Sequence, residues 1–214
     1  MTVTTMDNLR GGIAPNPGPD GGPEAREGRL LAHRSTTAFL GMVIFMASWA
    51  MLFAGLFFAY GVVRAGAHPW PPTDMPDLPL LLPGLATVAL ALSSLCLHKA
   101  LRHVRRGGDG AGFLVMGGAA LGSVFLVLQM NVWQQMWLLG LTPTAGPYAS
   151  VFYGLTVFHA LHVVVGLVAL GFVAVQTARR RYTQAHHIPL RLWALYWHMV
   201  GIVWGLMYVL VYVL

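Results

Sequence analysis

The stretch PYASVFYGLTVFHALHVVVGLVALGFVAVQT at residues 147–177 decides the fold of this chain. It contains no Asp, Glu, Lys or Arg. It also exceeds the about 20 residues that a helix with a rise of about 1.5 Å per residue needs to cross a bilayer core of about 30 Å. Only a helix satisfies the backbone N–H and C=O groups of such a segment internally, and the strictly alternating segments of about 10 residues that a membrane β-barrel needs are not visible. The stretch therefore predicts a transmembrane helix.

Four further apolar runs share this pattern, and short breaks rich in Pro, Gly and polar residues separate them. The runs cover about 35–64, 77–99, 111–140 and 189–214. Each is long enough to cross a membrane, and none has a charged residue in its interior. The sequence predicts an all-α integral membrane protein, with a five-helix transmembrane bundle over residues 35–214.

The composition excludes several other classes of protein. Of the 214 residues, 57% are hydrophobic and only 9% are charged, whereas soluble domains carry about 25% charged residues. This balance argues against a soluble globular domain, a nucleic-acid partner and a disordered chain. Cys96 is the one cysteine, which excludes a disulfide framework and a thiolate metal site within this chain.

Residues 1–34 differ from the rest of the chain. They contain six Gly and four Pro, interspersed with Arg and Glu, and few apolar residues. Proline interrupts both helices and strands, so we expect a flexible tail. The segment lacks the apolar core of a signal peptide.

The cations predict the orientation of the bundle. Twelve of the 13 Lys and Arg residues fall in the tail and in the second and fourth breaks, and only Arg64 falls on the opposite side. Cytoplasmic loops are enriched in Lys and Arg. We therefore expect a cytoplasmic N-terminus and an outside C-terminus.

Polar side chains inside the predicted spans are the candidate functional residues, because they are costly in a membrane. They include His159, His162, His198 and Gln129. His159 and His162 share one helix face and could bind a metal or haem with His198, but the three positions fall at different depths. Hydrogen bonds to neighbouring helices or lipid headgroups are therefore the favoured interpretation, and interhelical bonding is likewise favoured for Gln129.

Two pairs of glycines are spaced four residues apart, at Gly118 and Gly122 and at Gly201 and Gly205. Such spacing lets helix backbones approach closely. It indicates helix–helix contacts on the third and fifth runs.

The segments around the intramembrane histidines resemble subunit III of haem–copper oxidases. Phe158-His159-Ala160-Leu161-His162-Val163, followed by Gly166, is similar to the family's FHxxHV…G stretch. Tyr196-Trp197-His198-Met199-Val200, followed by Val203-Trp204, is similar to its YWHFVDxVW stretch. Further similarities, in chain order, are Leu40-Gly41-Met42 through Ala47-Ser48, Tyr60 and Arg64; Ser93-Ser94 with His98-Lys99-Ala100; and Leu121-Gly122, Phe125 and Gln129. The resemblance runs from about residue 36 to 214 and is to the short, five-helix bacterial form.

Three intramembrane acids of that family are missing. Trp49, Val132 and Gly201 stand where the family usually has carboxylates. Roles of those acids in proton delivery or carboxylate reactivity therefore do not carry over to this chain.

The resemblance implies a non-redox accessory subunit of a bacterial respiratory oxidase that reduces O2 to water and pumps protons. It implies no active site on this chain, with haem and copper in catalytic subunit I, and with subunit II and other respiratory-complex subunits as further partners. It also implies bound phospholipid, support of proton uptake and a place in the cytoplasmic membrane. The candidate lipid or interhelix contacts are His159, His162, His198, Gln129, Trp197, Arg34, Arg102 and Arg179.

Three alternatives remain open at this point. A subunit-III-like partner of nitric oxide reductase would share the same motifs. A haem-b membrane anchor would use the histidines as iron ligands. A small transporter would need an intramembrane charge or an internal repeat, and neither is apparent in the sequence.

Overall fold

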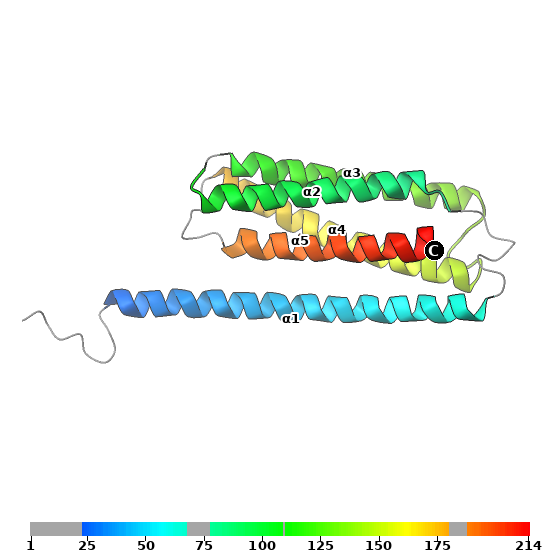
Figure 1. The fold of residues 1–214 in the computed structure, drawn as a ribbon, viewed down its shortest axis with the longest axis horizontal. Coiled ribbons are helices and arrows are strands. Elements are labelled where there is room, and N and C mark those ends of the chain that lie inside the picture. The colour runs from blue at the N-terminus through cyan, green and yellow to red at the C-terminus, as the bar shows by residue number, and fades with distance from the viewer. Residues whose placement is uncertain (1–22, 68–77, 109, 180–187) are drawn as a thin grey trace, which may run out of the picture. The chain divides into compact units, whose positions relative to one another are not determined.

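The computed structural model describes residues 23–67, 78–108, 110–179 and 188–214, with the side chains at 23–28, 30–32, 34 and 35 outside that description. The described residues form helices and no strand (Figure 1). In chain order the elements are α1 (Pro23–Gly66), α2 (Leu81–Arg105), α3 (Ala111–Leu138), α4 (Pro147–Ala178), α5 (Ile188–Met207) and the π-helix η1 (Tyr208–Val213).

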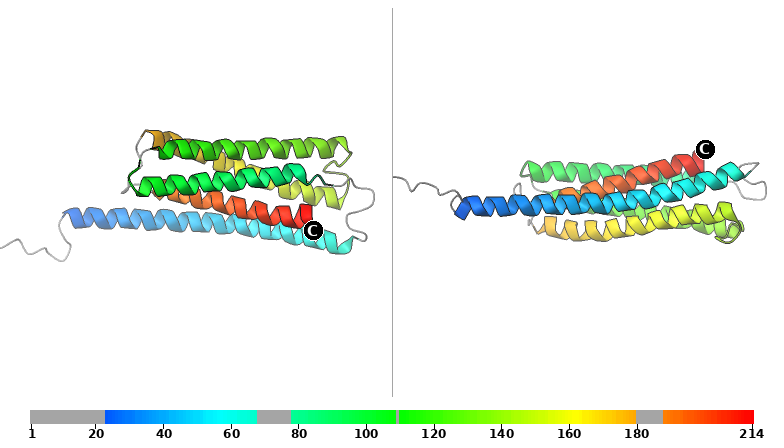
Figure 2. Two further views of the ribbon diagram at one scale, coloured as in Figure 1. Left: turned by 45° about the horizontal axis from the view of Figure 1, so that its top comes forward. Right: turned by 90° about the horizontal axis from the view of Figure 1, so that it is seen from below.

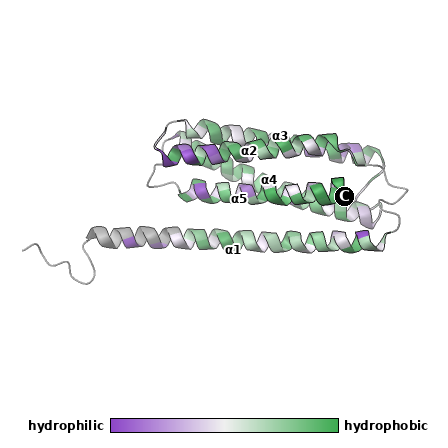
Figure 3. Ribbon diagram, in the orientation of Figure 1, coloured by the Kyte–Doolittle hydropathy of each residue, from purple (hydrophilic) through white to green (hydrophobic). Residues whose placement is uncertain are grey.

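Five membrane-length apolar segments confirm the predicted fold class. They cover Thr36–Gly66, Leu81–Arg105, Ala111–Leu138, Pro147–Ala178 and Ile188–Val213. Hydrophobic residues dominate the middle of every helix, and hydrophilic residues lie near helix ends (Figure 3). This distribution matches a bilayer, where polar groups are tolerated at the interfaces and expensive in between.

The chain divides into two units, Met1–Gly41 and Met42–Leu214. The described part of the first unit is the beginning of α1, where the Thr37 hydroxyl donates to the carbonyl of His33 at 3.0 Å. This helix begins at Pro23, so residues 23–34 of the predicted tail have helical backbone. The physical reason is local: Pro suits the first helical position, and the following Glu, Ala, Arg and Leu residues are good helix formers.

In the second unit, α2 packs against α3 and α5, and α4 packs against the same two helices. The four helices therefore form one closed arrangement, which two further views also show (Figure 2). The part of α1 that begins at Met42 contacts this arrangement through long side chains rather than through close backbone approach.

The bounds of α2 differ from the second predicted run. The helix begins at Leu81, after Pro79, because proline and the residue before it disfavour helical backbone. It continues to Arg105, since Leu101, Arg102 and Arg105 form helices readily although they are not all apolar. Hydropathy therefore marked the membrane segment and missed the helical extension beyond it.

The C-terminal end of the bundle is a π-helix that bonds to α1. The Tyr60 hydroxyl donates to the Leu210 carbonyl at 2.9 Å, and the Arg64 guanidinium donates to the Leu214 carbonyl at 2.7 Å. The wider π-turn displaces carbonyls from the regular helical pattern, so they can accept bonds from outside the helix. These bonds attach the end of α1 to the end of the chain.

Candidate functional site

The polar interior of the second unit is the candidate site, and His159 on α4 lies at its centre. Its ring is 1% exposed and packs against Phe53 of α1, Phe125 of α3 and Trp204 of α5, with ring centroids 6.1, 5.7 and 5.3 Å away. Neither ring nitrogen has a hydrogen-bond partner among the described residues. His159 thus joins four helices through aromatic packing.

His162 lies one turn further along α4 and is also buried. Its Nδ1 pairs with the Phe158 carbonyl at 2.5 Å, which ties the ring to its own helix. The Trp49 indole meets the His162 ring edge-on, and Phe53 packs beside it with a centroid distance of 4.9 Å. The position where the resembled family has a carboxylate is therefore filled here by an indole against His162.

Trp197 on α5 is fully buried between two glycines of neighbouring helices. A methyl group at Gly122 of α3 or at Gly166 of α4 would lie 2.6 or 2.7 Å from its ring. Because such distances are too short for carbon atoms, both positions require glycine for the indole to fit. The Gly118 and Gly122 contacts predicted from their spacing are confirmed, whereas a methyl group at Gly205 would meet nothing within 4 Å.

The Trp197 indole also begins a hydrogen-bond relay between helices. Its Nε1–H donates to the Ser93 hydroxyl at 2.9 Å, and that hydroxyl donates to the Gly118 carbonyl at 2.6 Å. The relay links α5, α2 and α3 in the bundle interior. In a membrane such bonds average only about 0.6 kcal/mol each. The close packing of the indole must therefore contribute to the association of these helices as well.

Three more interhelical bonds were not anticipated from the sequence. Trp204 Nε1 donates to Thr87 at 2.9 Å, Trp133 Nε1 donates to Thr156 at 3.0 Å, and the Tyr196 hydroxyl donates to the His162 carbonyl at 3.0 Å. The sequence signal for such bonds is the presence of Trp and Tyr donors and of Ser and Thr hydroxyls within the apolar runs. The pairing itself needs the fold, because the partners lie on different helices.

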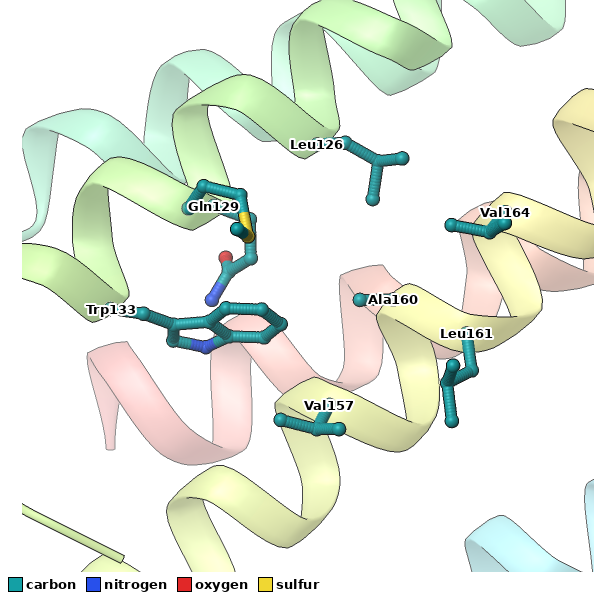
Figure 4. A pocket seen from close by; sticks show the side chains of 8 residues that line it. Leu126, Gln129, Trp133, Val157, Ala160, Leu161 and Val164 are labelled. Carbon is teal, nitrogen blue, oxygen red and sulfur yellow. The ribbon is translucent and has the colours of Figure 1, made fainter.

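Gln129 of α3 is 1% exposed and lines an apolar groove between α3 and α4 (Figure 4). The groove measures about 390 Å³, and its other walls include Trp133, Ala160 and Val164. Neither polar atom of the amide has a hydrogen-bond partner among the described residues, so these residues do not form the interhelical bond that the sequence predicted for Gln129. Gln129 thus belongs to the buried interior on one side and to the groove wall on the other.

His198 lies apart from the other two histidines. It borders a groove of about 460 Å³ between α2 and α5, and its ring centroid is 6.4 Å from that of His98. His159 and His162 instead pack against aromatic rings of other helices. These ring contacts argue against the haem alternative in which His159 or His162 pairs with His198 as an iron ligand.

The predicted arginine contacts occupy the helix ends. Arg102 is exposed in the last turn of α2. Arg179 follows α4 and borders a groove of about 450 Å³ between α3 and α4. The side chain of Arg34 lies outside the described residues. No group of three or more His, Cys, Asp or Glu side chains that could hold a metal ion occurs in the described part of the chain.

These features define a multi-pass helical membrane protein in which the buried His159 packs against aromatic rings of three other helices. A profile of the family described as cytochrome c oxidase subunit III matches residues 27–214. The chain belongs to that family.

Individual relatives agree with this assignment. The chain is 38% identical to cytochrome c oxidase subunit 3 of Synechocystis sp. over 177 residues, which cover 81% of this chain and 74% of the relative. It is 30% identical to that of Thermostichus vulcanus over 82% of this chain and 86% of the relative. It is 32% identical to the human protein over 80% of this chain and 67% of the relative. The predicted family is therefore confirmed.

Proposed function

We propose that this protein is the non-redox subunit III of a bacterial terminal oxidase that reduces O2 to water. In this proposal it binds the catalytic subunit, which holds the haem and copper, together with subunit II and further respiratory subunits. It stabilises the catalytic subunit and supports proton uptake. The family match over residues 27–214 carries the proposal. The oxidase names of the relatives favour this reading over a nitric oxide reductase partner.

Phospholipid binding is the second part of the proposal. The groove beside Arg179 is otherwise lined by apolar or small residues of α3 and α4, including Met116 and Val175. A guanidinium at the end of an apolar groove suits an anionic phospholipid, with the phosphate at the cation and an acyl chain along the groove. His159 and His162 are buried and fit packing roles better than lipid contacts.

The lipid proposal is testable on the purified protein. Arg179→Gln should reduce the anionic phospholipid that stays bound in native mass spectrometry, because the phosphate loses its charged partner. Arg102→Gln is the matched control, since Arg102 does not border that groove. Equal lipid retention by both variants and the unchanged protein would contradict the proposal.

We also propose that the protein lies in the bacterial cytoplasmic membrane, with 35–214 as its membrane domain and the preceding residues in the cytoplasm. The described cations support this orientation. Lys99, Arg102, Arg105 and Arg106 end α2, while Arg179 follows α4 and Arg191 begins α5. These helix ends lie together at one end of the bundle (Figure 1), as the positive-inside rule expects of the cytoplasmic side.

Deletion of the chain from its host tests the oxidase proposal. An oxidase purified through a tag on the catalytic subunit should keep most of its initial oxygen-reduction rate without this chain. It should lose activity sooner during sustained turnover, and restoring the gene should restore durability. Immediate and complete loss of turnover in an otherwise assembled complex would show that the role is not accessory.

A further inference from the structure

Two histidines from different helices meet at the cationic end of the bundle. His98 belongs to α2 and His198 to α5, and their ring centroids are 6.4 Å apart with the ring planes inclined by 60°. The two helices pack against each other, so the fold itself holds the pair together. His98 lies one turn before Arg102 in the last part of α2, which places it near the membrane surface.

Both imidazoles are available to a ligand from the aqueous side. Neither forms a hydrogen bond with another described residue, and they approach each other only as rings. His98 is exposed and His198 is half-exposed. The pair therefore differs from His159 and His162, which are buried among aromatic rings.

The separation of the rings is close to that of two histidines on one metal ion. Zn–N bonds are about 2.0–2.1 Å long, so two imidazoles that share a tetrahedral Zn²⁺ have ring centroids about 5 Å apart. The distance of 6.4 Å exceeds this value by roughly 1 Å. Rotation about the side-chain torsions of two accessible histidines can close such a gap without moving the helices.

The ligand chemistry selects the class of ion. No Asp or Glu is among the side chains that the structure describes, whereas Mg²⁺ and Ca²⁺ need oxygen ligands. Imidazole nitrogen suits Zn²⁺, Cu²⁺ and Ni²⁺. Two protein ligands leave the other positions of the ion to water, which is the pattern of an exchangeable ion and not of a closed structural site.

We propose that His98 and His198 form a binding site for a divalent transition-metal ion, with Zn²⁺ as the representative. The ion bridges α2 and α5 at the cationic end of the bundle and completes its coordination with water. This inference uses residues of this chain alone, so it stands or falls separately from the proposed function.

Zinc titration of the purified full chain in detergent tests the site. Zn²⁺ should raise the melting temperature of the unchanged protein, because an ion that binds only the folded state stabilises it. His98→Gln and His198→Gln should each raise the Zn²⁺ concentration needed for half of this shift by about tenfold or more, since loss of a direct ligand costs at least as much as loss of the groups that orient one. His103→Gln is the matched control, because His103 is an exposed histidine of α2 outside the pair.

Copper gives a spectroscopic count of the ligands. Cu²⁺ binds nitrogen sites more tightly than Zn²⁺ does, and pulsed EPR detects the imidazole nitrogens that coordinate it. At one equivalent of Cu²⁺, the unchanged protein should show two imidazoles on the ion and His98→Gln should show one. Because His98 is exposed, its replacement should leave the fold intact, and the melting temperature without metal checks this.

Three results would overturn the inference. The first is the absence of any Zn²⁺-dependent shift of the melting temperature up to millimolar Zn²⁺. The second is an equal Zn²⁺ response of His98→Gln, His103→Gln and the unchanged protein, which would mean an adventitious ion only, bound at other histidines. The third is a single imidazole on Cu²⁺ in the unchanged protein. Co-purification with a catalytic oxidase subunit is a separate measurement and decides the proposed function independently.

Discussion

Single residues hold this membrane bundle together where large aromatic rings meet glycines. Trp197 is fully buried between Gly122 and Gly166, and the same indole donates to Ser93. Lipid tails are as apolar as the helix surfaces, so close packing and hydrogen bonds must supply the association energy. Trp197 packs against α3 and α4 and donates a hydrogen bond to α2. We therefore expect the stability of the bundle to be sensitive to substitutions at Trp197 and at the residues around it.

Gly166→Ala should destabilise the protein strongly. The added methyl group would lie 2.7 Å from the Trp197 ring, and overpacking of this kind costs about 1–3 kcal/mol. Gly154→Ala on the same helix is the control, because its methyl group meets nothing within 4 Å. Thermal unfolding of the purified protein in detergent measures the difference. Equal melting temperatures for the two variants would contradict the enclosed position of Trp197.

A double-mutant cycle separates the hydrogen bond of Trp197 from its packing. Trp197→Phe and Ser93→Ala should each destabilise the protein, and the double variant should lose less than the sum by about 0.6 kcal/mol, the average worth of a membrane hydrogen bond. The coupling is measured by unfolding in mixed micelles. Strict additivity would mean that the indole and the hydroxyl do not interact.

The residue-scale site was only partly predictable from the sequence. The shared helix face of His159 and His162 follows from their spacing, and Gly118 and Gly122 follow from theirs. The ring contacts of Trp49 and Phe53 with His162 could not be predicted from spacing. They join α1 to α4 across about 100 residues of chain. Local periodicity contains no information about which side chains of distant helices meet.

At the scale of elements, a row of side chains on one face of α1 attaches this helix to the others. Phe45, Trp49, Phe53 and Tyr60 recur at helical spacing and reach α4, α5 or η1. Long side chains can bridge helices whose backbones stay apart, so the attachment depends on few contacts. The last of them, at η1, involves a carbonyl that accepts a bond from outside its own helix.

Tyr60→Phe should loosen the end of α1. The variant keeps the ring and removes the donor to the Leu210 carbonyl, at a cost of about 0.5–1.5 kcal/mol. Hydrogen exchange of η1 should become faster, because the π-helix loses an external bond. Tyr208→Phe is the control in η1 itself, since the Tyr208 hydroxyl bonds no other described residue. Equal exchange rates in the two variants would contradict a specific role for Tyr60.

Element existence was easier to predict than element bounds. The absence of charge over membrane-length runs predicts five helices, since no alternative satisfies the backbone in lipid. Hydropathy cannot mark where α1 begins at Pro23 or where α2 ends at Arg105, because helices continue into water when their residues favour it. The π-helix has no apolar period of its own and was not foreseen.

At the scale of the whole molecule, the distribution of cations predicts which side of the membrane each loop occupies. Cysteine labelling tests this orientation in a Cys96→Ser background, with one new cysteine at a time. Ala145→Cys lies in the α3–α4 connection, and Arg106→Cys lies at the end of α2, at the opposite end of the bundle. Both positions are exposed, so a membrane-impermeant maleimide should discriminate them by side alone. In intact cells we expect labelling of Ala145→Cys and not of Arg106→Cys, with the pattern reversed in inverted vesicles. Permeabilised membranes, in which both should react, control for access. The opposite pattern in intact cells would place the cationic end outside, and the positive-inside argument for this protein would be wrong.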